Sequence, residues 1–91
     1  MSPIEPDQDP VGDLRAEIAA NDLTLLAIVN RRIELVRRLK EHKDLQGLEF
    51  VDRAQEERLL DRLAEANQGP LSEDAVRDLY RTVLELTKRE L

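Results

Sequence analysis

The feature that most constrains the fold is a long, mostly apolar row in the first half of the chain. Its members recur every three or four residues, and no glycine or proline interrupts residues 13–46. This period is typical of a helix that packs along its length against another helix. The row consists of Leu14, Ile18, Asn21, Leu25, Ile28, Arg32, Leu35, Leu39 and His42. We therefore predict one helix, capped by Asp13, of about 31 residues and roughly 46 Å.

A helix of this length is too long for the rest of the chain to cover. The chain has 91 residues, and a compact domain of that size has a diameter of roughly 32 Å. The remaining short helices cannot bury the whole apolar row. We therefore expect a second copy of the chain to cover it, most simply by two-fold symmetry.

The sequence on either side of this helix suggests one helical domain with a leading segment. Residues 1–12 contain three of the four prolines, which predicts a flexible N-terminal segment before a domain at 13–91. A second helix should begin at Asp52, where Asp52 and Gln55 form a capping-box pattern, and end at Asn-Gln-Gly-Pro, 67–70.

A third helix should begin at Ser72 and carry Lys88 and Arg89 in its last turn, where the helix dipole favours cations. No useful stretch alternates in the manner of a strand. The predicted fold class is all-α, a three-helix protomer with one long N-terminal helix, in a helical homodimer.

Composition excludes several classes of function. A net charge of −6 and only two aromatic residues, Phe50 and Tyr80, disfavour nucleic-acid binding. The absence of cysteine excludes disulfides and thiolate zinc sites.

No apolar run reaches the roughly 18–20 residues of a membrane span, and the N-terminus lacks a signal-peptide pattern. We expect a cytoplasmic protein that binds neither membrane nor nucleic acid, and we predict no metal site.

Three cations on the long helix are candidates for binding an anion. Arg32 interrupts the apolar row, so it either forms an internal salt bridge, extends its head to solvent, or grips a carboxylate with its planar fork. Lys43 shares its face of the helix, about 16 Å further along. Arg15 lies roughly 25 Å before Arg32 and about 100° around the helix. It cannot reach the same pocket within its own chain, but it could do so from an antiparallel partner. For Arg15 and Lys43 the alternative is ordinary solvated charge.

Three polar residues on the later helices are further candidates. Asp52 and Glu56 are four residues apart and share a face at the start of the second helix. Glu56 is in line with leucines, so it could accept a hydrogen bond from a ligand hydroxyl, while Asp52 could serve only as a cap. Thr87 lies on the apolar stripe of the third helix and could simply bond to the backbone four residues earlier.

Together these residues resemble a known family. The stretches LRAEIAANDLTLLAIVNRR, ELVRRLKEHK and DRAQEERLLDRL resemble the all-helical chorismate mutases, the AroQ class, and the similarity covers about residues 13–91. The resemblance implies an intertwined homodimer of three-helix protomers with shared active sites. It also implies conversion of chorismate to prephenate in phenylalanine and tyrosine biosynthesis, without a cofactor.

The resemblance assigns roles by position. Arg15 would reach across the dimer to one substrate carboxylate, and Arg32 would bind the other within its own chain. Lys43 would donate to the ether oxygen of the breaking bond. Asp52 and Glu56 would lie near the ring hydroxyl, with Glu56 accepting its hydrogen bond. Thr87 stands where the family often has a serine near a carboxylate.

Two positions depart from the family pattern, and other functions remain open. Gln55 replaces the usual arginine, and Leu91 stands where a glutamine or glutamate is usual, with Glu90 one position short. The alternatives are an isochorismate-pyruvate lyase or an aminodeoxychorismate mutase of the same fold. A further alternative is a regulatory helical dimer module, or one whose catalysis depends on a partner enzyme of the shikimate pathway.

Overall fold

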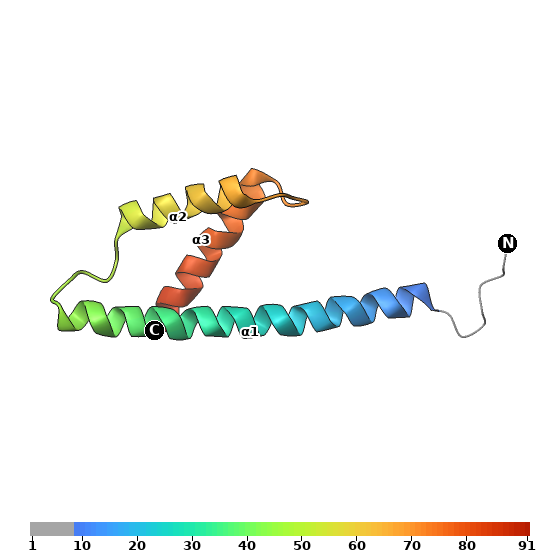
Figure 1. The fold of residues 1–91 in the computed structure, drawn as a ribbon, viewed down its shortest axis with the longest axis horizontal. Coiled ribbons are helices and arrows are strands. Elements are labelled where there is room, and N and C mark those ends of the chain that lie inside the picture. The colour runs from blue at the N-terminus through green and yellow to red at the C-terminus, as the bar shows by residue number, and fades with distance from the viewer. Residues whose placement is uncertain (1–8) are drawn as a thin grey trace. The chain divides into compact units, whose positions relative to one another are not determined.

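The computed structural model describes residues 9–91 and contains three helices (Figure 1). They are α1 (Pro10–Leu45), α2 (Arg53–Ala66) and α3 (Glu73–Arg89). No strand occurs in the described residues, so the all-α prediction is confirmed. The chain forms two compact units, one ending at Arg32 and the other running from Ile33 to Leu91.

Helix α1 begins four residues earlier than predicted. The side chain of Asp9 accepts a hydrogen bond from the Gly12 N–H at 3.0 Å, and the Asp9 carbonyl accepts one from the Asp13 N–H at 2.8 Å. Asp9 thus caps the helix, and Pro10 occupies the first helical position, where its missing N–H costs nothing. The prediction that Asp13 is the cap is wrong for this reason. The predicted flexible segment 1–12 therefore reaches into α1, and its residues 1–8 lie outside the described residues.

The end of α1 is a Schellman motif centred on Gly47. The Leu48 N–H donates to the Lys43 carbonyl at 2.8 Å, and the Gly47 N–H donates to the Asp44 carbonyl at 3.2 Å. Gly47 has a φ of 69°, which glycine adopts without strain. This turn ends the helix and directs residues 48–52 away from the axis of α1.

We expect Gly47→Ala to lower the free energy of unfolding by about 1–2 kcal/mol, because an alanine is strained in the left-handed region. No atom lies within 4 Å of a Cβ built at Gly47, so backbone strain accounts for the effect rather than a clash. Urea unfolding at fixed protein concentration measures it. Gln46→Ala, at the neighbouring loop position, is the control and should change little. A Gly47→Ala protein as stable as the wild type would contradict the prediction.

Asp52 and Ser72 cap α2 and α3 as predicted, but the Gln55 side chain accepts from Arg58 and is not described as completing the predicted capping box. The Asp52 carboxylate accepts a hydrogen bond from the Gln55 N–H, and the Ser72 hydroxyl accepts one from the Ala75 N–H, both at 3.1 Å. Asn67 follows α2 and closes the turn, because its side chain donates to the Leu71 carbonyl at 2.7 Å. These local contacts fix where both helices begin and where α2 ends.

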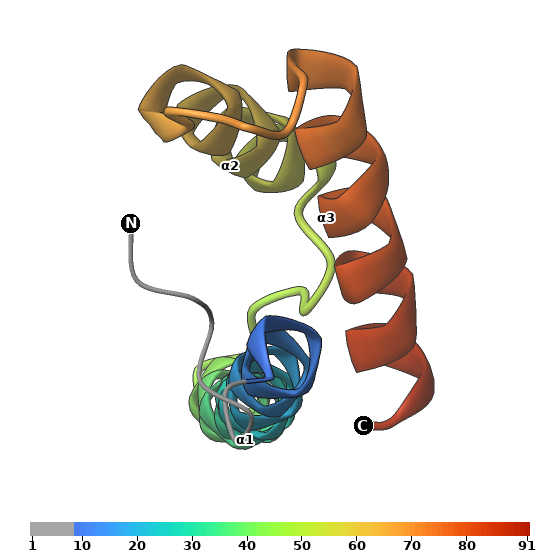
Figure 2. The same cartoon turned by 90° about the vertical axis from the view of Figure 1, so that its right-hand side faces the viewer.

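Helices α2 and α3 pack against each other across a small core (Figure 2). Leu60 of α2 and Val76 and Thr87 of α3 are the buried residues of the described chain, with exposures of 2–4%. Two ion pairs join the same helices, Arg77 to Asp61 at 3.0 Å and Lys88 to Glu56 at 2.7 Å. The Arg77 guanidinium donates hydrogen bonds to the carboxylates of Asp61 and Glu73. Both bonds raise the pKa of Arg77, and the bond to Asp61 has the larger effect.

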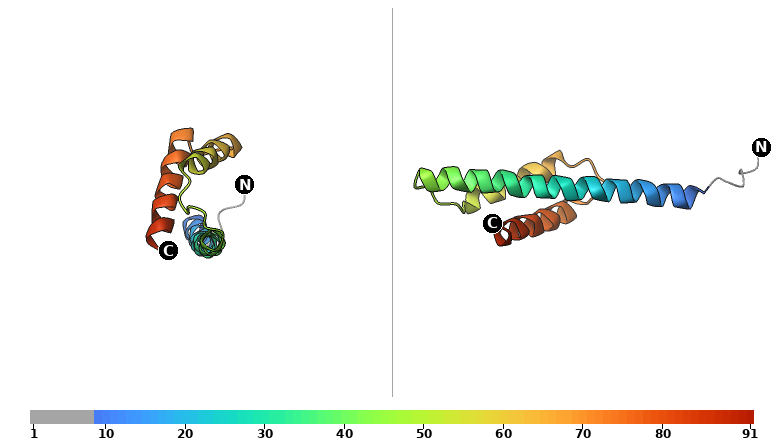
Figure 3. Two further views of the ribbon diagram at one scale, coloured as in Figure 1. Left: turned by 90° about the vertical axis from the view of Figure 1, so that its left-hand side faces the viewer. Right: turned by 90° about the horizontal axis from the view of Figure 1, so that it is seen from below.

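The C-terminal end of α3 lies beside the second half of α1 (Figure 3). The Arg37 guanidinium donates to the Glu90 carbonyl at 2.9 Å, and this carbonyl belongs to the residue that ends α3. The last turn of α3 is therefore attached to α1 through Arg37 and to α2 through Lys88. These two contacts hold the part of α3 that carries Thr87.

Helix α1 buries none of its own residues, although it carries the longest apolar row of the chain. Ile18 and Ile28 are each 60% exposed. The other large apolar residues of the predicted row that are exposed are Leu14, Leu25, Leu35 and Leu39. An apolar stripe of this extent is typical of a surface that another protein covers.

Candidate functional site

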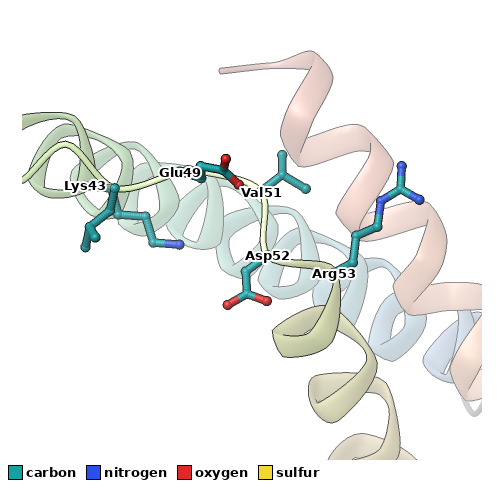
Figure 4. A pocket seen from close by; sticks show the side chains of 6 residues that line it. Lys43, Glu49, Val51, Asp52 and Arg53 are labelled. Carbon is teal, nitrogen blue, oxygen red and sulfur yellow. The ribbon is translucent and has the colours of Figure 1, made fainter.

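Lys43 and Asp52 line the same open pocket, which has a volume of about 630 Å³ (Figure 4). Lys43 comes from the last turn of α1 and Asp52 from the residue before α2. The other lining residues are Leu48, Glu49, Val51 and Arg53. Figure 4 shows the Lys43 side chain extending toward the start of α2, whereas Arg53 points away from Lys43. Of the predicted site residues, the structure brings these two together.

Lys43 is half-buried and has a defined position. Its ammonium group donates to the Phe50 carbonyl at 3.2 Å. The Schellman turn at Gly47 returns the chain so that this carbonyl lies within reach. One N–H of the ammonium group makes this contact, and a lysine carries three donors in all. The group can therefore hold the loop and also offer a proton to a ligand oxygen.

Asp52 is exposed and caps α2. Its Oδ1 atom accepts the Gln55 N–H, which confirms the capping interpretation. The Gln55 side chain accepts two hydrogen bonds from Arg58, at 2.9 and 3.2 Å. Whether Asp52 also contacts substrate stays a prediction.

Glu56 lines a second cavity of about 220 Å³ between α2 and α3. The Glu56 side chain is 25% exposed, and its Oε1 atom accepts from the Lys88 ammonium group at 2.7 Å. A carboxylate with this degree of burial requires a partner, and Lys88 supplies it. The structure therefore places Glu56 in a different cavity from the one that Lys43 and Asp52 line.

Thr87 is buried on α3. Its hydroxyl donates to the Val83 carbonyl at 2.7 Å, which confirms the interpretation of a threonine bonded to its own helix. A ligand could use the oxygen of this hydroxyl as an acceptor, or its proton after rotation. Substrate binding by Thr87 stays a prediction.

Arg15 and Arg32 lie on α1 in the unit that ends at Arg32. Arg15 is exposed and Arg32 is half-buried. That Arg15, Arg32 and Lys43 bind substrate in one site stays a prediction.

Lys88 is the residue of this region that sequence reasoning missed. The sequence pattern predicts only that Lys88 complements the helix dipole. The available signal was its position four residues after Leu84, which places it on the apolar face of α3. A charge on that face must find a partner on the helix opposite.

The described residues hold no group of histidine, aspartate and glutamate side chains arranged for a metal ion. None of the helices in this part of the chain combines the length and the apolar character that crossing a membrane requires.

The fold and these side chains define a small all-α protein with cationic and acidic groups at its helix ends. The chain matches the family model described as chorismate mutase type II over residues 14–90. The chain therefore belongs to the chorismate mutase type II family. Its function is that of a chorismate mutase, an isomerase.

Two solved structures have the same fold. Form I of the chorismate mutase from Thermus thermophilus superposes with a TM-score of 0.84 at 24% identity, covering 87% of this chain and 99% of that one. Form II of the enzyme from the same organism gives a TM-score of 0.85 at 23% identity, covering 89% and 92%. A comparison with curated proteins finds no match.

Proposed function

We propose that this chain converts chorismate to prephenate as a cytoplasmic homodimer with two shared active sites, in the synthesis of phenylalanine and tyrosine. The observation that carries the proposal is the half-buried Lys43 ammonium group, which is held at the rim of a pocket beside Asp52. In a reaction whose negative charge develops on one ether oxygen, a preorganised cation stabilises the transition state, and such stabilisation is usually the largest single contribution to the rate.

The uncovered face of α1 supports the homodimer. Large apolar side chains recur along this helix and remain exposed in the single chain. Fully burying one such side chain contributes about 1.5–3 kcal/mol. A second copy carries the same apolar row, so a two-fold interface would match each row with its equivalent.

The proposed site needs both chains for its two carboxylate-binding arginines. Chorismate carries two carboxylates, which an arginine fork binds with two parallel hydrogen bonds. Arg32 would bind one from its own chain, and Arg15 of the partner subunit would bind the other. Fixing both carboxylates folds the enolpyruvyl arm over the ring, which lowers the entropic part of the barrier.

The chemical step is a concerted rearrangement. One carbon–carbon bond forms while the carbon–oxygen bond of the ether breaks, so the residues act by position and charge. Lys43 would donate to the ether oxygen as negative charge gathers there. Glu56 would accept a hydrogen bond from the ring hydroxyl, with Asp52 near the same group, so the bound substrate would extend from the pocket of Lys43 and Asp52 to the cavity that Glu56 lines. Thr87 would lie near a carboxylate.

A direct assay tests this function. The purified protein should consume chorismate and yield prephenate, identified by mass and by its conversion to phenylpyruvate in acid. Isochorismate and aminodeoxychorismate are offered in parallel. Release of pyruvate from isochorismate would indicate a lyase, and turnover of the amino compound would indicate the corresponding mutase. Activity only after addition of an upstream shikimate-pathway enzyme would indicate partner-dependent catalysis. No turnover of chorismate in any arm would overturn the proposal.

A further inference from the structure

The ion pair between Lys88 and Glu56 connects α3 to the proposed site, and none of the roles assigned above uses Lys88. Its ammonium group lies 2.7 Å from Oε1 of Glu56. The contacts of Arg77 with Asp61 and Glu73 are longer, at 3.0 and 3.2 Å. A contact of this length between charged groups is a strong, directional hydrogen bond.

The pair is also better enclosed than an ordinary surface ion pair. The two side chains are 40% and 25% exposed, and both line the cavity between α2 and α3. By contrast, Lys40 and Asp44 on α1 are 3.7 Å apart and 46% and 60% exposed. Partial burial strengthens the electrostatic attraction and reduces screening by salt.

The backbone around Lys88 is fixed as well as its ammonium group. It lies two residues before Glu90, whose carbonyl accepts from Arg37 of α1. The last turn of α3 is therefore fixed against α1, and Lys88 reaches Glu56 from a defined backbone position. A lysine anchored in this way can hold a carboxylate in one orientation.

We infer that Lys88 is a positioning residue that orients the Glu56 carboxylate toward the ring hydroxyl of the substrate. The Lys88 ammonium group contacts Oε1 of Glu56. A carboxylate has two acceptor oxygens, so Oε2 is the atom that would accept a hydrogen bond from the hydroxyl. This inference rests on the proposed function, because it takes the acceptor role of Glu56 from there.

The consequence concerns specificity for the hydroxyl. A correctly oriented acceptor favours the substrate that carries the hydroxyl over an analogue that lacks it, because the analogue leaves the acceptor unpaired. Without Lys88 the carboxylate can rotate toward solvent, and this preference should decrease. General damage to the fold would instead lower the activity toward both compounds alike.

The experiment compares kcat/KM for chorismate and for its analogue without the ring hydroxyl. The ratio of the two values should fall by about 10-fold or more in Glu56→Gln and by about 3- to 10-fold in Lys88→Met. Lys88→Arg, which keeps the cation, should restore most of the ratio. Lys40→Met removes a lysine from the exposed ion pair on α1 and is the matched control, with an unchanged ratio.

The outcomes separate this inference from the proposed function. If Glu56→Gln leaves the ratio unchanged, the acceptor role of Glu56 is wrong, and the proposed site fails with it. If Glu56→Gln lowers the ratio while Lys88→Met does not, only the role of Lys88 is overturned. A fall in Lys88→Met that Lys88→Arg does not reverse would also overturn it.

Discussion

Replacing Lys43 with alanine is expected to lower kcat for chorismate by about 10²–10³-fold, because the reaction loses the cation that faces the developing negative charge. The interaction exists mainly in the transition state, so KM should change much less than kcat. Steady-state kinetics with prephenate as the measured product provide the test. A variant with wild-type turnover would show that the assignment of Lys43 is wrong.

The controls for Lys43 must separate catalysis from support of the loop. The ammonium group also donates to the Phe50 carbonyl, so the alanine variant loses this contact as well. Circular dichroism and urea unfolding establish whether the helices persist. Lys40→Ala removes a neighbouring lysine of the same helix and should keep near wild-type kcat. Lys43→Gln keeps a hydrogen-bond donor without the charge, and its residual rate reports how much of the effect is electrostatic.

Arg15→Ala and Arg32→Ala should each be almost inactive, and mixing the two inactive proteins should restore activity. Each mixed dimer would contain one site with both arginines and one site with neither. With random exchange of subunits, about half of the dimers are mixed, so about a quarter of the wild-type activity per chain should return. Unfolding and refolding the two variants together ensures the exchange, and the specific activity of the mixture is measured.

A chain that carries both Arg15→Ala and Arg32→Ala is the control, because mixing it with wild-type chain should lower the activity and not restore it. Mixed with an equal amount of wild-type chain, it should reduce the activity to about a quarter of that of pure wild type, because a mixed dimer contains no complete site. If each site used the arginines of a single chain, about half would remain. The absence of rescue in the first mixture and about half activity in the second would together refute a shared site.

Much of the fold could be predicted from local sequence signals. Asp52, Ser72 and the turn at Asn67 fix helix ends through contacts that span only a few residues, and these are visible in the sequence. The predicted start of α1 is wrong because two competing caps, Asp9 and Asp13, lie close together. Pro10 decides between them, since its ring is compatible with the first helical position.

The candidate site could be predicted less completely. From their positions on the predicted helices, the sequence identified Lys43, Asp52, Glu56 and Thr87 as candidate substrate-binding residues. It did not reveal that Asp52 shares a pocket with Lys43 while Glu56 faces another cavity with Lys88. Helical periodicity shows which face carries a residue, but not which helix lies opposite that face.

The sequence alone determined three helices, the exposed apolar row of α1 and the family to which the chain is similar, because periodicity, capping and motif spacing are properties of neighbouring residues. Only the tertiary structure decided that Lys88 of α3 pairs with Glu56 of α2 and that Arg37 of α1 holds the carbonyl of Glu90. These partners are far apart along the chain. Their meeting depends on how α2 and α3 pack around Leu60 and Val76, and side-chain packing of this kind follows from three-dimensional fit rather than from any local pattern.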